Sequence, residues 1–252
     1  MRIGIRHTNA HKLFAAALEA EKYLNVVSLF SHFADADNKD LSFAQVQLER
    51  FLEAARFFDN EHRPSPLLQI ANSAAILRME ESRLDMVRPG IMLYGYHPSS
   101  SSEAEADLLP ALSLRAKIMY FKVVLPGNSV SYGRTWTARK NCRVVTVPLG
   151  YGDGYARSLS NQGEVLIRGK KYPVIGTICM DQTMIGIGDG EAYIGDEAVL
   201  IGRQGKEIIT ADELAHQLDT ITYEVLTNIS ARVPRVFINS ECAEQEQAVV
   251  GL

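Results

Sequence analysis

The sequence has few cysteines, no long apolar run and no excess of basic residues. Its three cysteines, Cys142, Cys179 and Cys242, are odd in number and widely spaced, so they form neither a disulfide framework nor a metal-ligand pattern. No apolar stretch is long enough to cross a bilayer, and the first residues lack the apolar core of a secretion signal. The formal net charge of -4 gives no sign of a nucleic-acid or membrane-surface partner. These absences predict a protein of the reducing cytoplasm.

The composition is that of an ordinary globular protein. The 252 residues are 46% hydrophobic and 22% charged, which is enough for one large domain or two. In the first part of the chain, apolar alternation and helical periodicity follow one another. They predict strands at 2–6, 25–33, 67–71 and 85–95, and helices at 11–23, 42–59 and from Asn72. Such an order is typical of a parallel α/β sheet or barrel.

The pattern changes after a small, polar and acidic stretch at 98–107, which is typical of an exposed linker. Beyond it, strands follow one another without long helices between them. We expect strands at 112–125, 144–147, 165–167, 172–179 and 198–201, and helices at 211–218 and from Thr222. The predicted domains are therefore an α/β portion at 1–108, a β-rich domain at 109–240 and a frayed tail at 241–252.

The stretch 85–95 is the one around which the chain is organised, and it reads as a buried strand interrupted by Arg88. A buried guanidinium needs an acceptor, because leaving it unpaired is costly. Pro89 fixes one backbone dihedral, and Gly90 lets a ligand approach the backbone closely. The three residues together indicate a small-molecule site. The alternative is a strand end whose arginine pairs with a nearby carboxylate.

Two other strand ends carry polar residues. His32 is followed by Asp35 and Asp37, at the position where an α/β barrel places its chemistry. Asn72 and Ser73 begin a helix, whose free amides favour an anion or phosphate. The alternatives are a core histidine with a solvated acidic loop, and a helix cap that only caps.

Taken in order, these and later motifs resemble the alanine racemase family from Met1 to about Ile238. The motifs are Ser31-His32-Phe33, Asn72-Ser73, Val87-Arg88-Pro89-Gly90-Ile91 with Tyr94-Gly95, Val130-Ser131-Tyr132-Gly133, Gly150-Tyr151-Gly152-Asp153-Gly154-Tyr155, Cys179-Met180-Asp181-Gln182, Tyr223-Glu224 and Arg232-Val233-Pro234-Arg235. The resemblance implies part of a TIM-type α/β barrel followed by a mainly β domain. It also implies pyridoxal 5'-phosphate (PLP) as cofactor, and a homodimer in which the β domain of each subunit completes the other's site.

The resemblance assigns several residues to the cofactor. Arg88 corresponds to the arginine that donates to the pyridine nitrogen, which leaves the ring largely unprotonated and favours reprotonation over transamination. The other residues expected to hold or flank PLP are His32, Asn72, Ser73, Gly90, Ile91 and Tyr223. Ser73, Gly90, Ile91 and Tyr223 correspond to phosphate ligands.

The family interconverts L- and D-alanine, for cell-wall peptidoglycan, through a PLP aldimine and two bases on opposite faces of Cα. Tyr132 resembles the tyrosine base, although the residue alone reads as a tyrosine in a glycine-flanked turn. Met180 and Arg2 correspond to the residues that bind the substrate carboxylate. Tyr151, Arg157 and Asp37 correspond to positions that line the access corridor.

The resemblance breaks at the second base, which is a lysine that also holds PLP in a Lys-Ala-Asn-Ala-Tyr-Gly-like segment. Lys12, Lys22 and Lys39 lie in other contexts. We therefore expect this chain to lack that lysine and the first barrel strands, to expose strand edges, and to be inactive as it stands. The alternatives are a misplaced start of a full alanine racemase, a non-catalytic remnant, and an assembly or dimerisation module. A racemase of broader amino-acid specificity is a further alternative.

Overall fold

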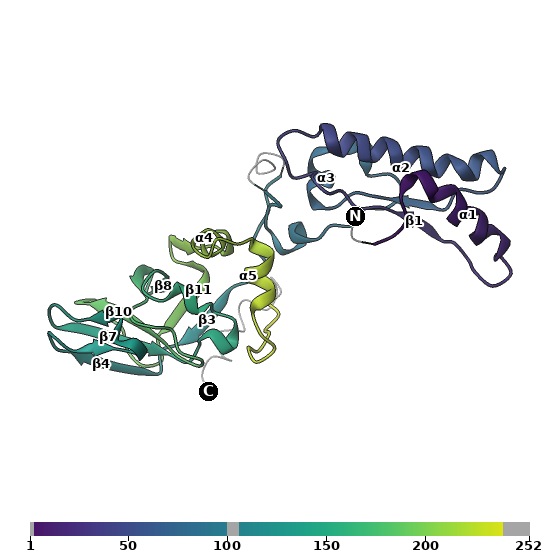
Figure 1. Ribbon diagram of the computed structural model, residues 1–252. Helices are drawn as coiled ribbons and strands as arrows, with labels where there is room; N and C mark the ends of the chain where they lie inside the picture. The colour runs from purple at the N-terminus through teal and green to yellow at the C-terminus, as the bar shows by residue number, and fades with distance from the viewer. Residues whose placement is uncertain (1–2, 100–105, 239–252) are drawn as a thin grey trace. The chain divides into compact units, whose positions relative to one another are not determined.

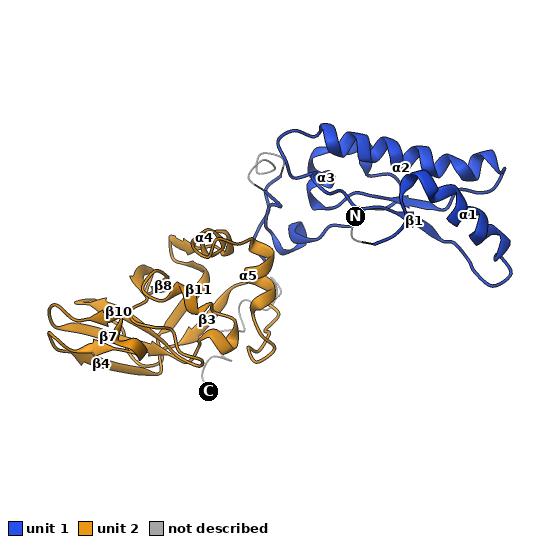
Figure 2. Ribbon diagram, in the orientation of Figure 1, with its two compact units in different colours: residues 1–111 blue, residues 112–252 orange. Residues whose placement is uncertain are grey.

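The computed structural model describes residues 3–99 and 106–238. The chain divides into two compact units, residues 1–111 and 112–252, which Figure 2 colours separately. Each unit is described by itself below.

Unit 1 is built on a small parallel sheet flanked by helices (Figure 1). Its strands are β1 (Ser28–Phe30) and β2 (Leu67–Gln69), which pair in parallel from Ser28 with Leu67 to Phe30 with Gln69. Its helices are α1 (Ala10–Glu19), α2 (Ser42–Asn60) and α3 (Ser73–Arg78). Single 3-10 turns span His7–Asn9, Glu80–Ser82 and Ile91–Tyr94.

The core of unit 1 lies between α2 and the segment that runs from β2 into α3. Helix α2 buries Ala44, Leu48, Ala55 and Phe58, whose spacing places them on one face. Of these, Ala44 and Leu48 pack with the buried residues Phe33, Ala36, Ile70, Ala71, Ala74, Ala75 and Met79. Away from this core, Val27, Phe30, Leu67 and Met86 expose large apolar surface.

The strand predicted within 85–95 is wrong. Only Met86 forms a single parallel bridge, to Gln69, and Ile91–Tyr94 is a 3-10 turn. Pro89 has no backbone N–H for a ladder, and the Gly90 amide donates to the Ser73 hydroxyl instead. The side chain of Arg88 therefore leaves an irregular segment, not a buried strand.

Two further expectations in unit 1 are corrected. The described residues 3–6 form no strand and lead into a 3-10 turn. Helix α1 ends at Glu19 instead of continuing to residue 23. Ring contacts of Phe14 with Phe57 and Phe58, at centroid distances of 5.7 and 5.2 Å, hold α1 against α2.

Unit 2 consists mainly of short antiparallel strands. They are β3 (Leu114–Lys117), β4 (Tyr120–Val124), β5 (Ser129–Val130), β6 (Trp136–Thr137), β7 (Cys142–Val147), β8 (Glu164–Ile167), β9 (Lys170–Pro173), β10 (Thr183–Gly188), β11 (Glu197–Gln204) and β12 (Glu207–Ile209). One sheet has the order β10-β7-β4, another β12-β11-β8-β9 with β3 beside β11, and β5 and β6 form a hairpin. Helices α4 (Ala211–Gln217) and α5 (Thr222–Asn228) follow. Single 3-10 turns span Tyr132–Arg134, Tyr151–Asp153 and Arg157–Leu159.

The strand predicted over 112–125 is two strands in different sheets. The chain switches sheets at Ile118 and Met119, whose amides donate to the carbonyls of Asp196 and Thr146 at 2.9 Å each. Strand β3 pairs with β11, and β4 pairs with β7. Apolar alternation runs through both strands, so the sequence pattern hides the break.

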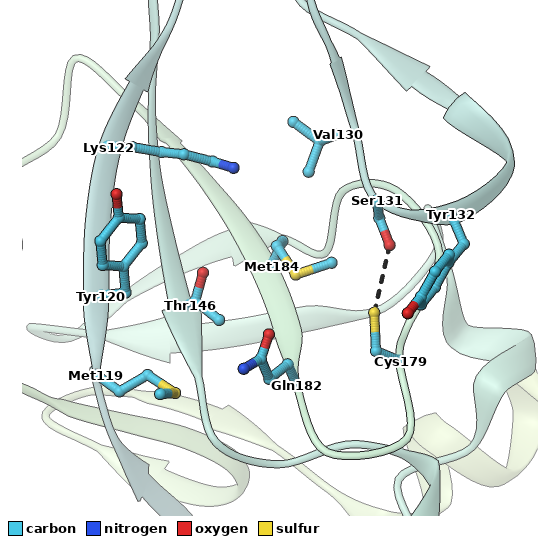
Figure 3. A pocket seen from close by; sticks show the side chains of 10 residues that line it. All are labelled: Met119, Tyr120, Lys122, Val130, Ser131, Tyr132, Thr146, Cys179, Gln182 and Met184. Carbon is cyan, nitrogen blue, oxygen red and sulfur yellow. Dashed lines mark hydrogen bonds between the residues drawn. The ribbon is translucent and has the colours of Figure 1, made fainter.

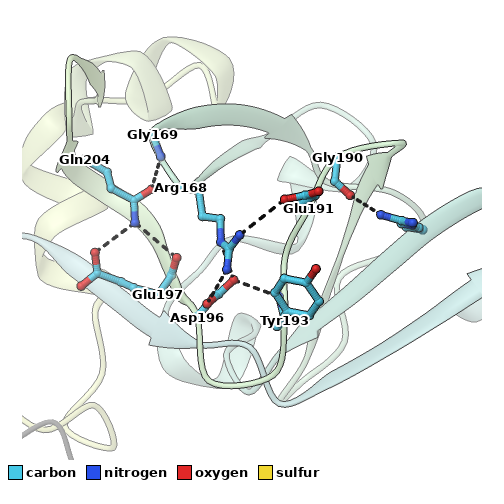
Figure 4. A network of polar contacts seen from close by, with 9 residues as sticks. Arg168, Gly169, Gly190, Glu191, Tyr193, Asp196, Glu197 and Gln204 are labelled. Atoms are coloured by element: carbon cyan, nitrogen blue, oxygen red, sulfur yellow. Dashed lines mark hydrogen bonds and ion pairs between the residues drawn. The ribbon is translucent and has the colours of Figure 1, made fainter.

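A polar network ties the β8–β9 turn to the loops around β11 (Figure 4). The Arg168 guanidinium donates to Asp196 at 2.8 Å and lies over the Tyr193 ring at 5.0 Å. The Gln204 side chain accepts from the Gly169 amide at 2.9 Å and donates to Glu197 at 3.1 Å. These bonds cross-link turns that are far apart in sequence, which fixes the strand ends of this sheet.

The predicted fold class, an α/β portion followed by a mainly β domain, is confirmed. Among the described residues, no helix has the length and apolarity that a membrane crossing requires. The same residues contain no group of three or more metal-ligating side chains.

Candidate functional site

Arg88 is held at both ends of its guanidinium in unit 1. NH1 donates to Gln69 Oε1 at 2.9 Å, and NH2 donates to the Ser31 carbonyl at 2.7 Å. NH2 also lies 3.4 Å from Nδ1 of His32, and the guanidinium carbon is 5.7 Å from the Phe30 ring centroid. Partial burial lowers the pKa of Arg88 from its usual value, but an arginine keeps its charge at neutral pH.

These contacts leave the Nε–H of Arg88 for a ligand. The hydrogen bonds of the guanidinium to described residues use NH1 and NH2, so the Nε–H remains for a further acceptor. The acceptors are carbonyl and amide oxygens, so no carboxylate within residues 3–99 and 106–238 neutralises the charge. The alternative of an arginine paired to a carboxylate is therefore not what the structure contains.

A second group of polar atoms lies at the start of α3. Asn72 caps the helix, since its Oδ1 accepts from the Ala75 amide at 3.1 Å. The buried Ser73 hydroxyl accepts from the Gly90 amide at 2.8 Å. Accepting this bond leaves the hydroxyl proton directed elsewhere. The Arg88 amide donates to the Ala71 carbonyl at 3.0 Å. The segment that carries Arg88 and Gly90 is therefore hydrogen-bonded to the segment that leads into α3.

The surroundings of Gly90 are open on one side. A Cβ atom built on Gly90 meets only the Ser73 hydroxyl, at 3.6 Å, so the space a side chain would fill is left to a ligand. Ile91 follows at the start of a 3-10 turn with its side chain buried. The first amides of such a turn point outward without partners inside the turn, and this favours an anion.

Sequence reasoning missed Gln69. Its side chain is buried and lies between Ser28, to which it donates at 2.9 Å, and Arg88. The signal was a single polar residue within the apolar run of β2. Asp37 lies in the loop after β1, where its carbonyl accepts from Ser99 at 2.8 Å.

In unit 2, Tyr132 stands on a tight turn after β5, and 72% of the residue is exposed. It lines an open pocket of about 700 Å³ together with Met119, Tyr120, Lys122, Val130, Ser131, Thr146, Cys179, Gln182 and Met184. Figure 3 shows Tyr120 and Lys122 on β4 at one side of this pocket, opposite Ser131 and Tyr132. The exposed phenol is therefore accessible to a second molecule.

Met180 and Tyr151 lie on two loops that are hydrogen-bonded to each other. The amides of Tyr151 and Gly152 donate to the carbonyls of Cys179 and Met180 at 3.0 and 2.9 Å. A Cβ on Gly150 would lie 2.1 Å from the Cys179 carbonyl oxygen, so only glycine allows this approach. Backbone hydrogen bonds between the two loops therefore fix the positions of Tyr151 and Met180 relative to each other.

Arg232 joins the same two loops through their acidic residues. Its Nε lies 3.3 Å from Asp153 Oδ1, and its NH2 donates to Asp181. The hydrogen bond that Arg232 donates to Asp181 and the charge of Asp153 raise the pKa of Arg232. The motif Arg232-Val233-Pro234-Arg235 by itself predicts no role for this arginine. The acids Asp153 and Asp181 in two other motifs were the sequence signal for its partners.

The remaining candidates are spread through unit 2. Arg157 begins a 3-10 turn, and Tyr223 lies in the first turn of α5, where it is partly exposed. Arg2 lies outside the described residues, as do most of the predicted linker and the predicted tail. Within unit 1 the structure brings together His32, Arg88, Asn72, Ser73 and Gly90; within unit 2 it brings together Tyr151 and Met180.

Comparisons with known proteins cover most of the chain. Residues 1–98 match the family described as "Alanine racemase, N-terminal domain", and residues 111–237 match "Alanine racemase, C-terminal domain". A curated alanine racemase of Carboxydothermus hydrogenoformans is 48% identical over 219 residues, which are 86% of this chain and 60% of the relative.

Solved structures agree with these matches. The crystal structure of alanine racemase from Bacillus anthracis with bound L-Ala-P has a TM-score of 0.89 at 39% identity, over 95% of this chain and 62% of that one. Alanine racemase from Bartonella henselae with covalently bound pyridoxal phosphate has a TM-score of 0.80 at 28% identity, over 94% and 63%. The chain spans about three fifths of the length of the relatives that it matches.

Proposed function

Since this chain belongs to the alanine racemase family of PLP-dependent isomerases, we propose that it supplies the cofactor-ring, phosphate and tyrosine contacts of an enzyme that interconverts L- and D-alanine. The observation that carries the proposal is the Arg88 guanidinium, which is held by neutral acceptors beside the Ser73–Gly90 pair. No other described group in unit 1 combines a held cation with an open glycine backbone.

The residues of unit 1 fit PLP. A pyridine nitrogen is an acceptor, and the Arg88 Nε–H is a donor that the hydrogen bonds to the described residues do not use. A phosphate accepts several hydrogen bonds. The Ser73 hydroxyl proton and the Ile91 amide are donors beside Gly90, where the absence of a Cβ leaves space. When bound, PLP makes the Cα proton of an attached amino acid removable.

The residues of this chain then have separate tasks. Arg88 holds the ring nitrogen without protonating it, while Ser73, Gly90, Ile91 and Tyr223 hold the phosphate. Asn72 keeps the start of α3 in place, and His32 packs beside Arg88 at 3.4 Å. Holding the cofactor by both ends fixes the face of Cα from which a proton leaves.

Tyr132 moves a proton on one face of Cα, and the Met180 backbone with Arg2 binds the substrate carboxylate. Tyr151, Arg157 and Asp37 line the route by which substrate arrives. We propose that Tyr132 and Met180 serve a second copy of the chain in a homodimer. The exposure of Tyr132 (72%) and Met180 (52%) supports this, since a large aromatic and a large apolar residue are open to a partner.

The second base is a lysine in the family, and none of these 252 residues resembles its segment. We propose that residues outside this chain supply it. The chain alone is then a PLP-binding and dimer-forming portion, and racemisation requires the lysine-bearing segment.

Cofactor binding is tested by equilibrium dialysis of the 252-residue chain against PLP and against pyridoxal, which lacks the phosphate. We expect PLP to bind about tenfold more tightly than pyridoxal, because the phosphate makes several hydrogen bonds. Ser73→Ala and Gly90→Ala should each remove most of this preference, whereas Ser65→Ala, at an exposed serine of the same unit, should keep it. Equal affinity for both ligands would contradict the phosphate site.

Unfolding midpoints are measured for the same variants, since Gly90 has φ -109° and ψ -100°, a conformation that alanine adopts rarely. If Gly90→Ala keeps the unfolding midpoint and loses the preference for PLP over pyridoxal, the phosphate binds at this glycine. If the unfolding midpoint of Gly90→Ala falls, the phosphate site is judged from the affinities of Ser73→Ala alone.

Racemisation is tested with the chain alone and with a fusion that places the lysine-bearing segment of the Carboxydothermus hydrogenoformans relative before Met1. In D₂O with PLP, we expect D-alanine from L-alanine only with the fusion. Tyr132→Phe in the fusion should stop racemisation, while the lysine still exchanges the Cα proton of D-alanine. A fusion that binds PLP and does not racemise alanine would sink the proposal.

A further inference from the structure

The turn that carries Tyr132 has an unusual backbone. Ser131 and Arg134 have φ values of 67° and 51°, in the left-handed region that side chains disfavour, and Gly133 has φ 72°. A turn with two non-glycine residues in this region persists only where its surroundings hold it. Such strain is found most often at functional sites.

The surroundings that hold this turn are provided by Thr177. Its Oγ1 donates to the Tyr132 carbonyl at 2.8 Å, and its own carbonyl accepts from the Ser131 hydroxyl. Thr177 is 6% exposed, so this hydroxyl lies on the buried side of the turn. Gly176 lets the two segments approach, because a Cβ there would lie 2.7 Å from the Val130 carbonyl oxygen.

Asn161 ties the other end of the turn to the same segment. Its Nδ2 donates to Thr135 Oγ1 at 3.0 Å, and its Oδ1 accepts from the Gly176 amide at 2.6 Å. Thr177 therefore holds the start of the turn and Asn161 holds its end. Neither side chain lies among the residues to which the family resemblance gives a role.

We infer that Thr177 and Asn161 are positioning residues, which set the direction in which the turn presents the Tyr132 phenol. The inference rests on the proposed function only where it calls that phenol a base. Since 72% of Tyr132 is exposed, the phenol has few neighbours within unit 2, and its direction follows from the backbone that these two side chains hold.

The first test is amide hydrogen exchange of residues 131–135 in the full chain without cofactor. Thr177→Val keeps the shape and removes the hydroxyl, and exchange should rise about fivefold as one hydrogen bond is lost. Asn161→Ala should raise it similarly. Thr177→Ser, which restores a hydroxyl, should return exchange toward the original rate. Unchanged exchange in Thr177→Val and Asn161→Ala would overturn the inference.

Thr137→Val is the matched control. Thr137 lies in the same hairpin, and its Oγ1 lies 3.0 Å from the Ser129 hydroxyl, so the variant also loses a side-chain hydrogen bond. That bond does not reach the backbone of the turn. Exchange of residues 131–135 should therefore stay the same, which separates loss of the hairpin from loss of the hold on Tyr132.

The second test uses the racemising fusion. Thr177→Val should lower kcat about tenfold with little change in KM, because proton transfer depends on geometry more steeply than binding does. It should raise the primary isotope effect for Cα-deuterated L-alanine more than for D-alanine, since only the tyrosine step slows. Faster exchange with unchanged isotope effects would make Thr177 merely structural. If the unsubstituted fusion does not racemise, the proposed function fails, and hydrogen exchange alone decides whether Thr177 and Asn161 hold the turn.

Discussion

Tyr155 has a fully buried side chain whose hydroxyl makes no hydrogen bond to any described residue. Burial raises the pKa of this hydroxyl, and the charge of Glu164 raises it further. A buried unpaired hydroxyl gives no hydrogen-bond stabilisation, so Tyr155→Phe should leave the free energy of unfolding at pH 7 unchanged or raise it by up to about 1 kcal/mol. Urea unfolding measures the difference.

The same substitution changes the response to alkaline pH. A tyrosine in the unfolded chain ionises near pH 10, whereas the folded pKa of Tyr155 is higher. Its contribution to stability is present below pH 10 and is lost above it, by about 1.4 kcal/mol per pH unit. Between pH 10 and 11 the Tyr155→Phe protein should lose less stability than the original. Tyr120→Phe, at an exposed tyrosine, is the control. Parallel pH curves for all three proteins would contradict this.

Gly150 is the residue at which the Tyr151 and Met180 loops approach most closely. A Cβ at this position would lie 2.1 and 2.6 Å from the carbonyl oxygens of Cys179 and Met180. Backbone must move to admit it, so Gly150→Ala should lower the free energy of unfolding by about 2–3 kcal/mol. Gly127→Ala, where a Cβ meets nothing within 4 Å and only the φ of 81° disfavours a side chain, should cost less, about 1 kcal/mol. Equal losses would mean that contact is not the cause.

At the scale of single residues, the sequence indicated Arg88 but not its partners. A charged residue beside a proline and a glycine is visible in any short window. Gln69 and Ser31, which hold the guanidinium, lie 19 and 57 positions away. Thr177 is also far from Tyr132 in sequence, at 45 positions, and a threonine inside an apolar segment carries no local signal. Contacts across such separations are set by the fold.

Among the elements, α4 begins with a reciprocal cap. Thr210 Oγ1 accepts from the Glu213 amide at 3.0 Å, and the Glu213 carboxylate accepts from the Thr210 amide at 3.2 Å. Thr210→Ala removes one of these bonds and should lower the free energy of unfolding by about 1 kcal/mol. Urea unfolding checks the value. Thr210→Ser, which keeps the oxygen, should lose much less; an equal loss would exclude capping as the reason.

Element types were predicted better than element boundaries. Helices α2 and α4 follow from apolar spacing, and their predicted ranges, 42–59 and 211–218, differ by one residue from those observed. The break between β3 and β4 and the lost strand near Arg88 depend on which sheet edge each backbone meets. The backbone partners at these two places are Asp196 and Thr146 for the break and Ser73 for the segment after Arg88. None of the three is a sequence neighbour of the segment it bonds.

For the whole molecule, the order of patterns was enough to predict an α/β portion followed by a mainly β domain. Each unit has a core formed by its own residues, Phe33 to Met79 in unit 1 and Val124 to Met184 in unit 2. Helical periodicity followed by short alternating strands reports this change of architecture directly. Which residues form the site depends instead on which loops each unit brings together. Hydrophobic periodicity does not predict those contacts.

Strand β4 lies at the edge of its sheet, and its residues Tyr120 to Val123 are exposed. Lys122 is the only charge in the run Tyr120-Phe121-Lys122-Val123-Val124-Leu125. A single lysine on an aromatic and β-branched edge is a gatekeeper against fibril growth. Lys122→Thr should shorten the lag of thioflavin-positive aggregation at constant folded stability, whereas Lys140→Thr, on an exposed turn, should not. Lys122 then protects this edge strand from pairing with another chain, in addition to lining the pocket beside Tyr132.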